Sequence, residues 1–496
     1  MRLVQKVFDN PSKLEALVKE KFAFPDFIMM ENAALALKKL VLQLAETPRP
    51  LCLILCGKGN NGGDGYALAR LLSGQLEVLL FCLEAPVARE AQVQYQMCKK
   101  IGIKFISQTA LFELLDRSKG QPDFIIDCLY GSGFKGQPSP KLQKILTAAN
   151  KAKSIRIACD IPTALEFKAH YTVTMGEHKI QLFSDKAKEA AGTIILAPLG
   201  LDPALFQGLV PDSKVPAFLI SVADMKLPLR TDKAAHKGTY GHTAVMAGEK
   251  SGAAILCATA AMHFGSGLTS LVRRPSSNLN QFKISPELMI SEPDKRGLPV
   301  IPAKTSCLVY GPGIEAIRQD DLDLIYSWFS SGKSKSPAAV FDAGLFSSPE
   351  FPDFLKRLDK IAGARIVLTP HLLEFTRFCK SLKLFKDLTV QELTDNPQLK
   401  IQAGKKINKL FPNTCLVIKS ANTFIACRGQ IFIVTDGGPC LAKGGSGDIL
   451  AGMIASLLAQ GYSPKDAAIS ACEAHALAGK NHGSDSYDLT PLKLCR

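Results

Sequence analysis

The chain has 496 residues, too many for one ordinary core at about 100–200 residues per domain, so at least two domains are predicted. Hydrophobic residues make up 47% and charged residues 21%, values typical of globular proteins, which excludes a disordered or fibrous chain. The formal net charge of +15 favours anionic ligands but does not distinguish nucleotides from nucleic acid.

Cysteine usage and the termini favour a cytoplasmic protein. The 14 cysteines occur singly, without a CxxC pair or a zinc-type spacing, and several lie within apolar runs, as reduced thiols do. Residues 1–13 are charged and lack the apolar run of a secretory signal. The longest apolar stretches, such as residues 449–459, contain Gly and Ser and fall short of the roughly 20 residues of a membrane span. No membrane segment is expected.

Short apolar runs alternate with helix-length segments along nearly the whole chain, which predicts parallel sheets covered by helices, the α/β class. In the first part, strands are predicted at residues 51–56, 76–83, 124–128 and 154–159. Helices are predicted at residues 27–46, 65–72, 87–100 and 141–151. The strands are continuous apolar runs, as expected of a sheet that is covered on both faces.

The second part shows the same alternation. Strands are predicted at residues 243–247, 268–272, 307–310, 339–342, 366–369 and 414–419, and a hairpin at residues 423–427 and 430–434. The segment between the two parts, residues 198–228, is rich in proline and lacks periodicity. We therefore expect a boundary near Lys226, with domains 1–225 and 226–496, and an exposed polar loop at residues 330–336.

A glycine-rich segment follows the first predicted strand and opens a helix: Cys56-Gly57-Lys58-Gly59-Asn60-Asn61-Gly62-Gly63-Asp64-Gly65. Glycines let the backbone approach a ligand closely, and the free N–H groups at a helix start favour a phosphate. The alternative is a strand-to-helix turn without a ligand. Such a turn does not require the side-chain oxygens of Asn60, Asn61 and Asp64, so we interpret the segment as a phosphate site.

Two further strands end in aspartate. Asp127 is followed by the loop Gly131-Ser132-Gly133-Phe134-Lys135-Gly136-Gln137, and Asp160 by Ile161-Pro162-Thr163. Ligands of open α/β sheets bind outside the carboxyl ends of the strands, so these polar ends are expected to converge on one crevice. Their amide, carboxylate and hydroxyl oxygens suit a cation. Each aspartate taken alone would more simply be a helix cap.

Together with Met30-Glu31-Asn32-Ala33, these segments resemble the YjeF N-terminal domain of NAD(P)H-hydrate epimerases over about residues 1–220. The resemblance implies a Rossmann-like three-layer sandwich. It also implies that Asn60 to Asp64 and Gly131 to Gln137 bind the substrate phosphates, that Asn61, Asp127 and Thr163 bind a potassium ion, and that Asp160 contacts the nicotinamide ring. Ala164 stands where the family usually has glycine, the residue that best tolerates a positive φ.

A second glycine cluster, Lys443-Gly444-Gly445-Ser446-Gly447-Asp448-Ile449, opens an apolar helix. Backbone N–H groups in such a loop neutralise a phosphoryl group, and Asp448 is placed to accept a proton from an attacking hydroxyl. The alternative is an acidic residue favoured by the helix dipole, worth about 0.3–1 kcal/mol. The combination of an anion loop with a carboxylate favours catalysis.

An ordered set of further segments resembles the ADP- or ATP-dependent NAD(P)H-hydrate dehydratases of the ribokinase-like superfamily, over about residues 230–490. The segments are His236-Lys237-Gly238, Gly252-Ala253-Ala254, Gly265-Ser266-Gly267-Leu268, Gly311-Pro312-Gly313, Asp342-Ala343, Thr369-Pro370-His371 and Lys419 to Thr423. The resemblance implies a hydrate site made by Ala253, Gly313, His371 and Asp448. It implies a site for ADP or ATP with Mg²⁺ made by Lys419, Ser420, Ala421, Asn422, Thr423 and Gly447.

Leu373, Ser420 and Gly344 depart from the dehydratase pattern. His371 is as well explained by a structural role as by a catalytic one, and His475 is interpreted as structural. The mechanism implied by the resemblance transfers the terminal phosphate of the nucleotide to the hydrate hydroxyl, which Asp448 activates. Phosphate then leaves.

We therefore expect a bifunctional repair enzyme that epimerises the R and S hydrates of NADH and NADPH (NADHX and NADPHX) and dehydrates the S form. One alternative is a ribokinase-like kinase for a vitamin-type alcohol, with a non-catalytic nucleotide-binding N-terminal domain. Another is an RNA scaffold, since YjeF-type domains also occur in decapping enhancers. Dispersed basic residues and a single Trp disfavour nucleic acid. The choice between ADP and ATP, and a homo-oligomer, stay open.

Overall fold

The computed structural model describes residues 5–9, 11–116, 120–331, 336–385, 387–483 and 485–495. It divides into two units, Met1–Pro216 and Ala217–Arg496. The division falls inside the proline-rich segment that the sequence marks as the seam. The predicted polar loop at 330–336 and the N-terminal stretch 1–13 lie partly outside the described residues.

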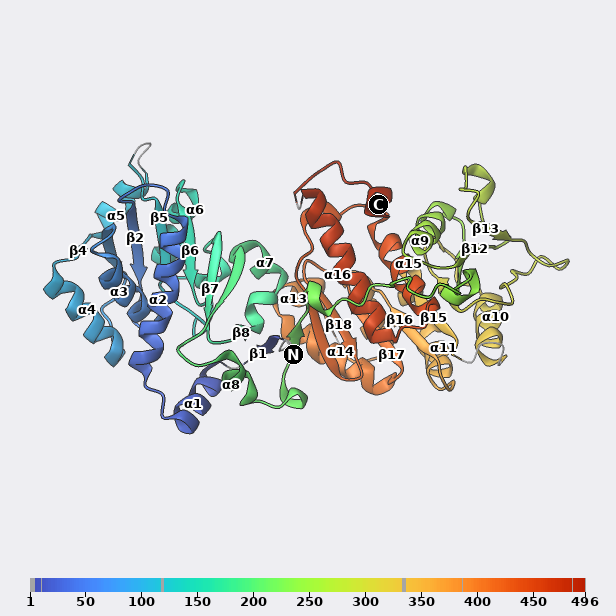
Figure 1. The fold of residues 1–496 in the computed structure, drawn as a ribbon, viewed down its shortest axis with the longest axis horizontal. Coiled ribbons are helices and arrows are strands. Elements are labelled where there is room, and N and C mark those ends of the chain that lie inside the picture. The colour runs from blue at the N-terminus through green and yellow to red at the C-terminus, as the bar shows by residue number, and fades with distance from the viewer. Residues whose placement is uncertain are drawn as a thin grey trace. The chain divides into compact units, whose positions relative to one another are not determined.

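The first unit is built on a sheet that has seven strands in the described residues, in the order β4-β3-β2-β5-β6-β7-β9 (Figure 1). All of its neighbouring strands pair in parallel. The strands are β2 (Leu51–Cys56), β3 (Glu77–Cys82), β4 (Lys104–Phe105), β5 (Phe124–Cys128), β6 (Ile155–Cys159), β7 (Tyr171–Met175) and β9 (Thr193–Ala197). This is the Rossmann order, and it reverses between β2 and β5, where the ends of the two strands leave room for a ligand.

Helices cover both faces of this sheet, which gives the predicted three-layer sandwich. Alternate residues of a strand point to opposite faces, so Cys52 and Ile54 join one core cluster while Leu53 and Leu55 join the other. The first cluster includes residues of α2 (Asp26–Leu44), α3 (Asn60–Leu72) and α4 (Arg89–Ile101); the second includes residues of α5 (Gln108–Leu115) and α6 (Pro140–Lys151). Flanking elements are β1 (Gln5–Phe8), α1 (Pro11–Phe22), β8 (His178–Lys179), α7 (Asp185–Ala191) and α8 (Pro203–Gly208).

The second unit carries its own sheet, whose strands run in the order β13-β12-β11-β14-β15-β16-β17-β18-β19-β10. From β13 to β17 the pairs are parallel, and β18 pairs antiparallel with both β17 and β19. The strands are β10 (Ala217–Leu219), β11 (His242–Ala247), β12 (Leu268–Arg273), β13 (Met289–Ser291), β14 (Cys307–Tyr310), β15 (Ala338–Phe341), β16 (Arg365–Leu368), β17 (Thr414–Ile418), β18 (Thr423–Cys427) and β19 (Gln430–Val434). Here the order reverses between β11 and β14.

Helix α15 (Ser446–Ala459) is the central helix of the second unit. It packs against α9 (Ser251–His263), α16 (Pro464–Gly483) and the strands β11, β14 and β15, and nearly all of its residues are buried. Its burial explains the apolar sequence, as in any helix that is surrounded by protein. The other helices are α10 (Gln319–Ser330), α11 (Phe351–Asp359), α12 (Leu372–Ser381), α13 (Val390–Asp395) and α14 (Pro397–Leu410). Among the described residues, no helix combines the length and the hydropathy that crossing a membrane requires.

The predicted strands of both units are confirmed within one or two residues, and so is the hairpin β18–β19, which turns at Arg428 and Gly429, both with positive φ. Strands β1, β4, β7, β8 and β9 of the first unit and β10 and β13 of the second were not predicted. Helix α3 was predicted to start at Gly65, five residues late, because the glycine-rich segment itself forms the first turns of the helix.

Candidate active sites

The glycine-rich segment of the first unit is a tightly packed start of helix α3. A Cβ atom on Gly62 would lie 1.9 Å from the carbonyl oxygen of Gly57, and one on Gly65 would lie 2.7 Å from Cys56 Sγ. These glycines therefore bring α3 close to the sheet, a role that the sequence analysis did not foresee. Gly59, at the N-cap of α3, faces open space instead, as does Gly133 in the loop after β5.

Asn61 lies in the first turn of α3 and carries an unsatisfied amide. Its Oδ1 and Nδ2 atoms are both buried, and neither has a hydrogen-bond partner in the described part of the chain. A buried polar group without a hydrogen-bond partner lowers the stability of the folded state by about 1–3 kcal/mol. Such groups are rare in native proteins and often indicate a binding site.

Asp127, at the end of β5, is bound directly to Thr163. The Thr163 hydroxyl donates to Asp127 Oδ1 at 2.7 Å and its backbone N–H donates to Oδ2 at 2.8 Å. The carboxyl is fully buried, and burial raises its pKa to about 6 although the hydrogen bonds from Thr163 oppose the rise. The structure thus brings together two of the three predicted potassium ligands.

Asp160, directly after β6, lies in the left-handed region of the backbone, with φ +70°. Its Oδ2 accepts a hydrogen bond from the backbone N–H of Ser132 at 3.1 Å. A Cβ on Gly131 would come within 2.7 Å of the same oxygen, so glycine is required there. Asp160 and the start of the loop 131–137 therefore form one unit, as predicted, whereas Lys135, Gly136 and Gln137 are exposed.

Sequence reasoning missed a buried lysine at this site. Lys179 lies on β8, and its ammonium is 2.6 Å from Asp160 Oδ1. Asp64 belongs to the same cluster, since Asp160 is among the charges that raise its pKa after the main effect of burial. The signal in the sequence was the polar run Glu177-His178-Lys179, which follows β7 after Gly176.

In the second unit, the predicted anion loop forms the N-terminus of α15. Gly445 has φ +92°, and a side chain there would collide with Leu256 and Pro491. The Ser446 hydroxyl lies 3.1 Å from Nε2 of His475 on α16. Burial lowers the pKa of His475 to about 4, so the ring is neutral and positions the loop without charge.

Asp448, in the first turn of α15, lies among other charged groups from three separate elements. Burial raises its pKa to about 7; Asp342 and Glu374 add to the rise, and Lys419 opposes it. Lys419 is fixed by Asp342, with 2.8 Å between Nζ and Oδ1. At Gly447 a Cβ would come within 3.3 Å of the same ammonium, so the start of α15 lies close to Lys419.

His371 caps helix α12. Its Nδ1 accepts from the Glu374 N–H at 3.4 Å, while Glu374 accepts from the His371 N–H at 2.9 Å and lies 3.2 Å from Nε2. His371 therefore has the structural role of a helix cap. About half of its side chain remains exposed.

The segment 419–423 connects β17 to β18. Its Ser420 hydroxyl accepts from Lys400 Nζ at 2.8 Å and donates to the Asn422 carbonyl oxygen at 2.6 Å. Helix α14, which carries Lys400, therefore fixes the shape of this turn, while Lys419 at its start points to Asp342.

The loop that precedes α9, whose first turn carries Ala253, is tied to the loop that carries Gly313. The Lys250 N–H donates to the Gly313 carbonyl at 2.9 Å, and a side chain on Gly313, which has φ +69°, would collide with Lys250. Both loops follow strands at the point where the sheet order reverses, β11 and β14.

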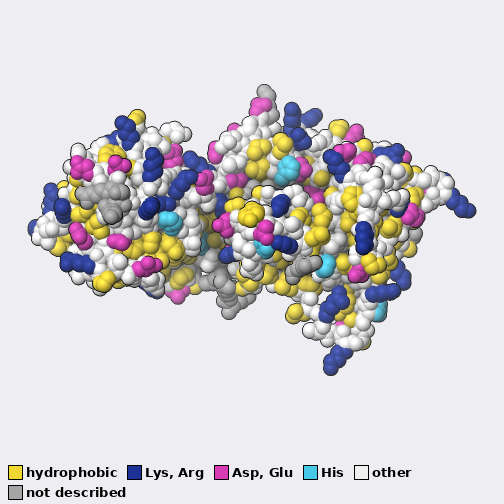
Figure 2. Space-filling model, turned by 90° about the horizontal axis from the view of Figure 1, so that it is seen from above, with side chains coloured by type: hydrophobic (Ala, Val, Ile, Leu, Met, Phe, Trp, Pro, Cys, Tyr) yellow, Lys and Arg dark blue, Asp and Glu magenta, His cyan; other side chains and the backbone are white. Residues whose placement is uncertain are grey.

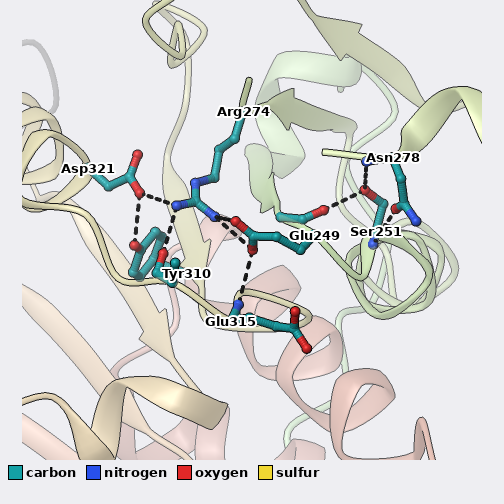
Figure 3. Close-up of polar contacts among 9 residues, drawn as sticks. Glu249, Ser251, Arg274, Asn278, Tyr310, Glu315 and Asp321 are labelled. Carbon is teal, nitrogen blue, oxygen red and sulfur yellow. Dashed lines mark hydrogen bonds and ion pairs between the residues drawn. The ribbon is translucent and has the colours of Figure 1, made fainter. Parts of the chain in front are cut away.

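A buried arginine supports both loops from behind (Figure 3). Arg274 is fully buried and lies 2.7 Å from Asp321 and 3.3 Å from Glu249. Glu249 in turn accepts from the Glu315 N–H at 3.1 Å, and Tyr310 donates to Asp321 at 3.0 Å. Removing one partner of such a buried network costs about 3–5 kcal/mol, so the loops are held rigidly.

The surface carries its positive charge in dispersed form. On the face that Figure 2 shows, Lys and Arg side chains alternate with acidic and apolar ones and do not merge into one patch. This distribution matches the scattered basic residues of the sequence.

Comparisons with known proteins cover both units. A family model of the YjeF-related protein N-terminus matches residues 26–180, and one of NAD(P)H-hydrate dehydratase matches residues 243–495. The bifunctional NAD(P)H-hydrate repair enzyme Nnr of Helicobacter pylori is 38% identical over 499 residues, 98% of this chain and 98% of that protein. The enzyme of the same name from Escherichia coli is 27% identical, over 90% of this chain and 85% of that protein.

Solved structures are similar to part of the chain. An ADP/ATP-dependent NAD(P)H-hydrate dehydratase from Bacillus subtilis, co-crystallised with ATP and Mg²⁺, is 25% identical and covers 54% of this chain and 91% of its own, with a TM-score of 0.43. A ribokinase-like superfamily protein from Enterococcus faecalis is 20% identical and covers 56% and 92%, with a TM-score of 0.42.

Proposed function

The chain belongs to the family of bifunctional NAD(P)H-hydrate repair enzymes, and we propose that its two sites divide the repair between them. It is an NAD(P)H-hydrate epimerase and an ADP/ATP-dependent NAD(P)H-hydrate dehydratase, as the sequence predicted. In our proposal, domain 1–225 epimerises the hydrate around Asp160, and domain 226–496 dehydrates it around Asp448.

In the first site, Asp160 carries the proton that epimerisation requires. The R and S hydrates differ at the carbon that bears the hydroxyl, so one bond of this carbon must break and re-form. Asp160 would take the hydroxyl proton while the bond from this carbon to the ring nitrogen breaks to leave a carbonyl, and would return the proton when the ring closes on the other face. The Asp160 carboxylate lies at a strand end, between the Ser132 N–H and the Lys179 ammonium. Phosphates of the substrate would contact the start of α3 and the loop 131–137.

Asn61, Asp127 and Thr163 would hold the potassium ion. Their oxygens suit a hard cation. The Asn61 amide oxygen has no hydrogen-bond partner among the described residues and is therefore available as a ligand. When bound, the ion would supply a fixed positive charge that attracts the substrate phosphates.

In the second site, Asp448 accepts the hydroxyl proton of the S hydrate. The hydroxyl oxygen then bonds to the terminal phosphorus of the nucleotide, whose bond to the bridging oxygen breaks. The C–O bond then breaks, and its electron pair leaves with the phosphate. Loss of a proton from the neighbouring carbon restores the dihydronicotinamide. The anion loop at Gly444 to Gly447 would stabilise the charge on the phosphoryl group. Ala253, Gly313 and His371 would line the hydrate pocket.

Residues 419–423 and Gly447 would bind ATP or ADP. Among the described residues, no three His, Cys, Asp or Glu side chains cluster as metal ligands. Magnesium often keeps waters and phosphate oxygens as most of its ligands, which fits an ion that arrives with the nucleotide.

The observation that carries this proposal is the cluster of Asp448, Lys419, Asp342 and Glu374 at one helix start. The test is to incubate the protein with R or S NADH hydrate and with ATP or ADP, and to follow the absorbance of the restored dihydronicotinamide. Recovery from the S form alone would retain the dehydratase site and reject Asp160 as an epimerase residue. Recovery from neither would reject both assignments.

A further inference from the structure

Lys179 is a buried cation with a complete set of acceptors. Its side chain is 1% exposed, and its ammonium lies 2.6 Å from Asp160 Oδ1, 2.8 Å from the Met175 carbonyl oxygen and 3.3 Å from Thr174 Oγ1. The ammonium donates to the Met175 carbonyl and the Thr174 hydroxyl, and the ion pair with Asp160 is the third contact that fixes its position. Although burial opposes its charge, the neighbouring carboxyls raise the pKa of Lys179, which therefore stays protonated.

Three other carboxyls surround this cation, and burial disfavours the charge on each. Burial raises the pKa of Glu177, 3.9 Å from Lys179, to about 8, and it also raises the pKa values of Asp64 and Glu15. The adjacent His178 is neutral, since burial lowers its pKa to about 4. Of the carboxylates around it, that of Asp160 makes the shortest contact with the Lys179 ammonium, at 2.6 Å against 3.9 Å for Glu177.

Asp160 is held from two sides in a strained conformation. Lys179 binds Oδ1 and the Ser132 N–H binds Oδ2, while the Asp160 N–H donates to the Val173 carbonyl at 2.8 Å. A non-glycine residue with φ +70° costs of order 1–3 kcal/mol and persists only where its surroundings impose it. Strained residues of this kind cluster at functional sites, which fits a carboxylate whose orientation is important for catalysis.

We propose that Lys179 is the positioning residue of the epimerase site, whose ammonium holds the Asp160 carboxylate in place between β8 and the loop 131–137. This inference rests on the proposed role of Asp160. In the reaction, one proton moves from the hydrate to Asp160 and back, and Lys179 keeps all of its own protons throughout.

The test is the pH profile of R-to-S conversion in the full-length protein carrying Lys179→Met. Removing a partner that supports general base catalysis is expected to lower kcat about 100-fold at neutral pH and to change KM by less than threefold. Lys179 also lowers the pKa values of the neighbouring carboxyls of Glu177, Asp64 and Glu15, so its removal should move the pH profile to higher pH. The control Lys168→Met removes an exposed ion-paired lysine of the same unit and should leave rate and profile unchanged.

A double variant separates positioning from a loss of folding. In the Asp160→Asn background, Lys179→Met should cause no further loss of rate, because the two residues act as one unit. The double variant leaves no unpaired charge, so it should also unfold at a higher temperature than Lys179→Met alone.

If the wild-type protein shows no epimerisation, the proposed function of the first site fails. If the wild type is active and Lys179→Met matches it in rate and pH profile, the role of Lys179 fails while that of Asp160 stands. A double variant that unfolds at a lower temperature than Lys179→Met alone would also overturn the inference.

Discussion

The ammonium of Lys419 lies 2.8 Å from the carboxylate of Asp342, and both groups border Asp448. The sequence assigned Lys419 to the nucleotide together with residues 420–423. The contact with Asp342 adds a second role, because a positive charge here offsets the acidic groups that surround the proposed base.

Lys419→Met should slow dehydration and move its pH dependence. Lys419 lowers the pKa of Asp448, so its removal should raise that pKa and shift the alkaline rise of kcat to higher pH. The comparison is kcat against pH for dehydration of the S hydrate. Lys226→Met, which removes an exposed ion pair of the same unit, should leave the curve in place. A curve for Lys419→Met that overlays the wild-type curve would contradict this role.

Asp448→Asn should abolish dehydration, with kcat reduced about 10²–10⁴-fold, and leave nucleotide affinity nearly unchanged. In the wild type, burial raises the pKa of Asp448 to about 7, and only the ionised form is a base. The rate should therefore rise between about pH 6 and 8 and then become level. Turnover by the variant at the wild-type rate would remove Asp448 from the mechanism.

The sheets were predictable from the sequence because buried parallel strands are continuous apolar runs. The site was predictable only in part. Asp127 and Thr163 meet, as expected of neighbouring strand ends, but the partner of Asp160 is Lys179, 19 positions later and reached through the turn after β7. Such pairings depend on how strands beyond the motif fold back, which no local spacing encodes.

The same limit applies to the glycines. Their spacing indicated a phosphate loop, yet Gly62 and Gly65 are required by the contact of α3 with Gly57 and Cys56. A glycine that allows close helix packing and one that admits a ligand look alike in sequence.

Ala164→Gly should stabilise the protein. Ala164 has φ +59°, a left-handed conformation that costs an L residue about 1–2 kcal/mol, and the gain is reduced by the flexibility of glycine in the unfolded chain. The expected increase in the free energy of unfolding is about 0.5–1 kcal/mol, measured by urea denaturation. Ala45→Gly, at φ −72°, is the control and should destabilise. Equal effects of the two substitutions would show that Ala164 is not strained.

Potassium should reverse the effect of Asn61→Leu on stability. Without the ion, the variant removes an unsatisfied buried amide and should be neutral or stabilising. With saturating KCl, only the wild type gains stability, by mass action. The measurement is the melting temperature in KCl against NaCl at equal ionic strength. Equal KCl effects on both proteins would exclude Asn61 as a ligand.

The division of labour between Asp160 and Asp448 is tested most directly by supplying R NADH hydrate and ATP to the two single variants, separately and mixed. We expect Asp160→Asn to convert the S hydrate but to recover the R form no faster than the spontaneous rate, and Asp448→Asn to recover neither. An equal mixture should restore NADH from the R form, because one variant epimerises what the other dehydrates. Recovery from the R form at the wild-type rate by Asp160→Asn alone, or a mixture that stays inactive, would contradict the account.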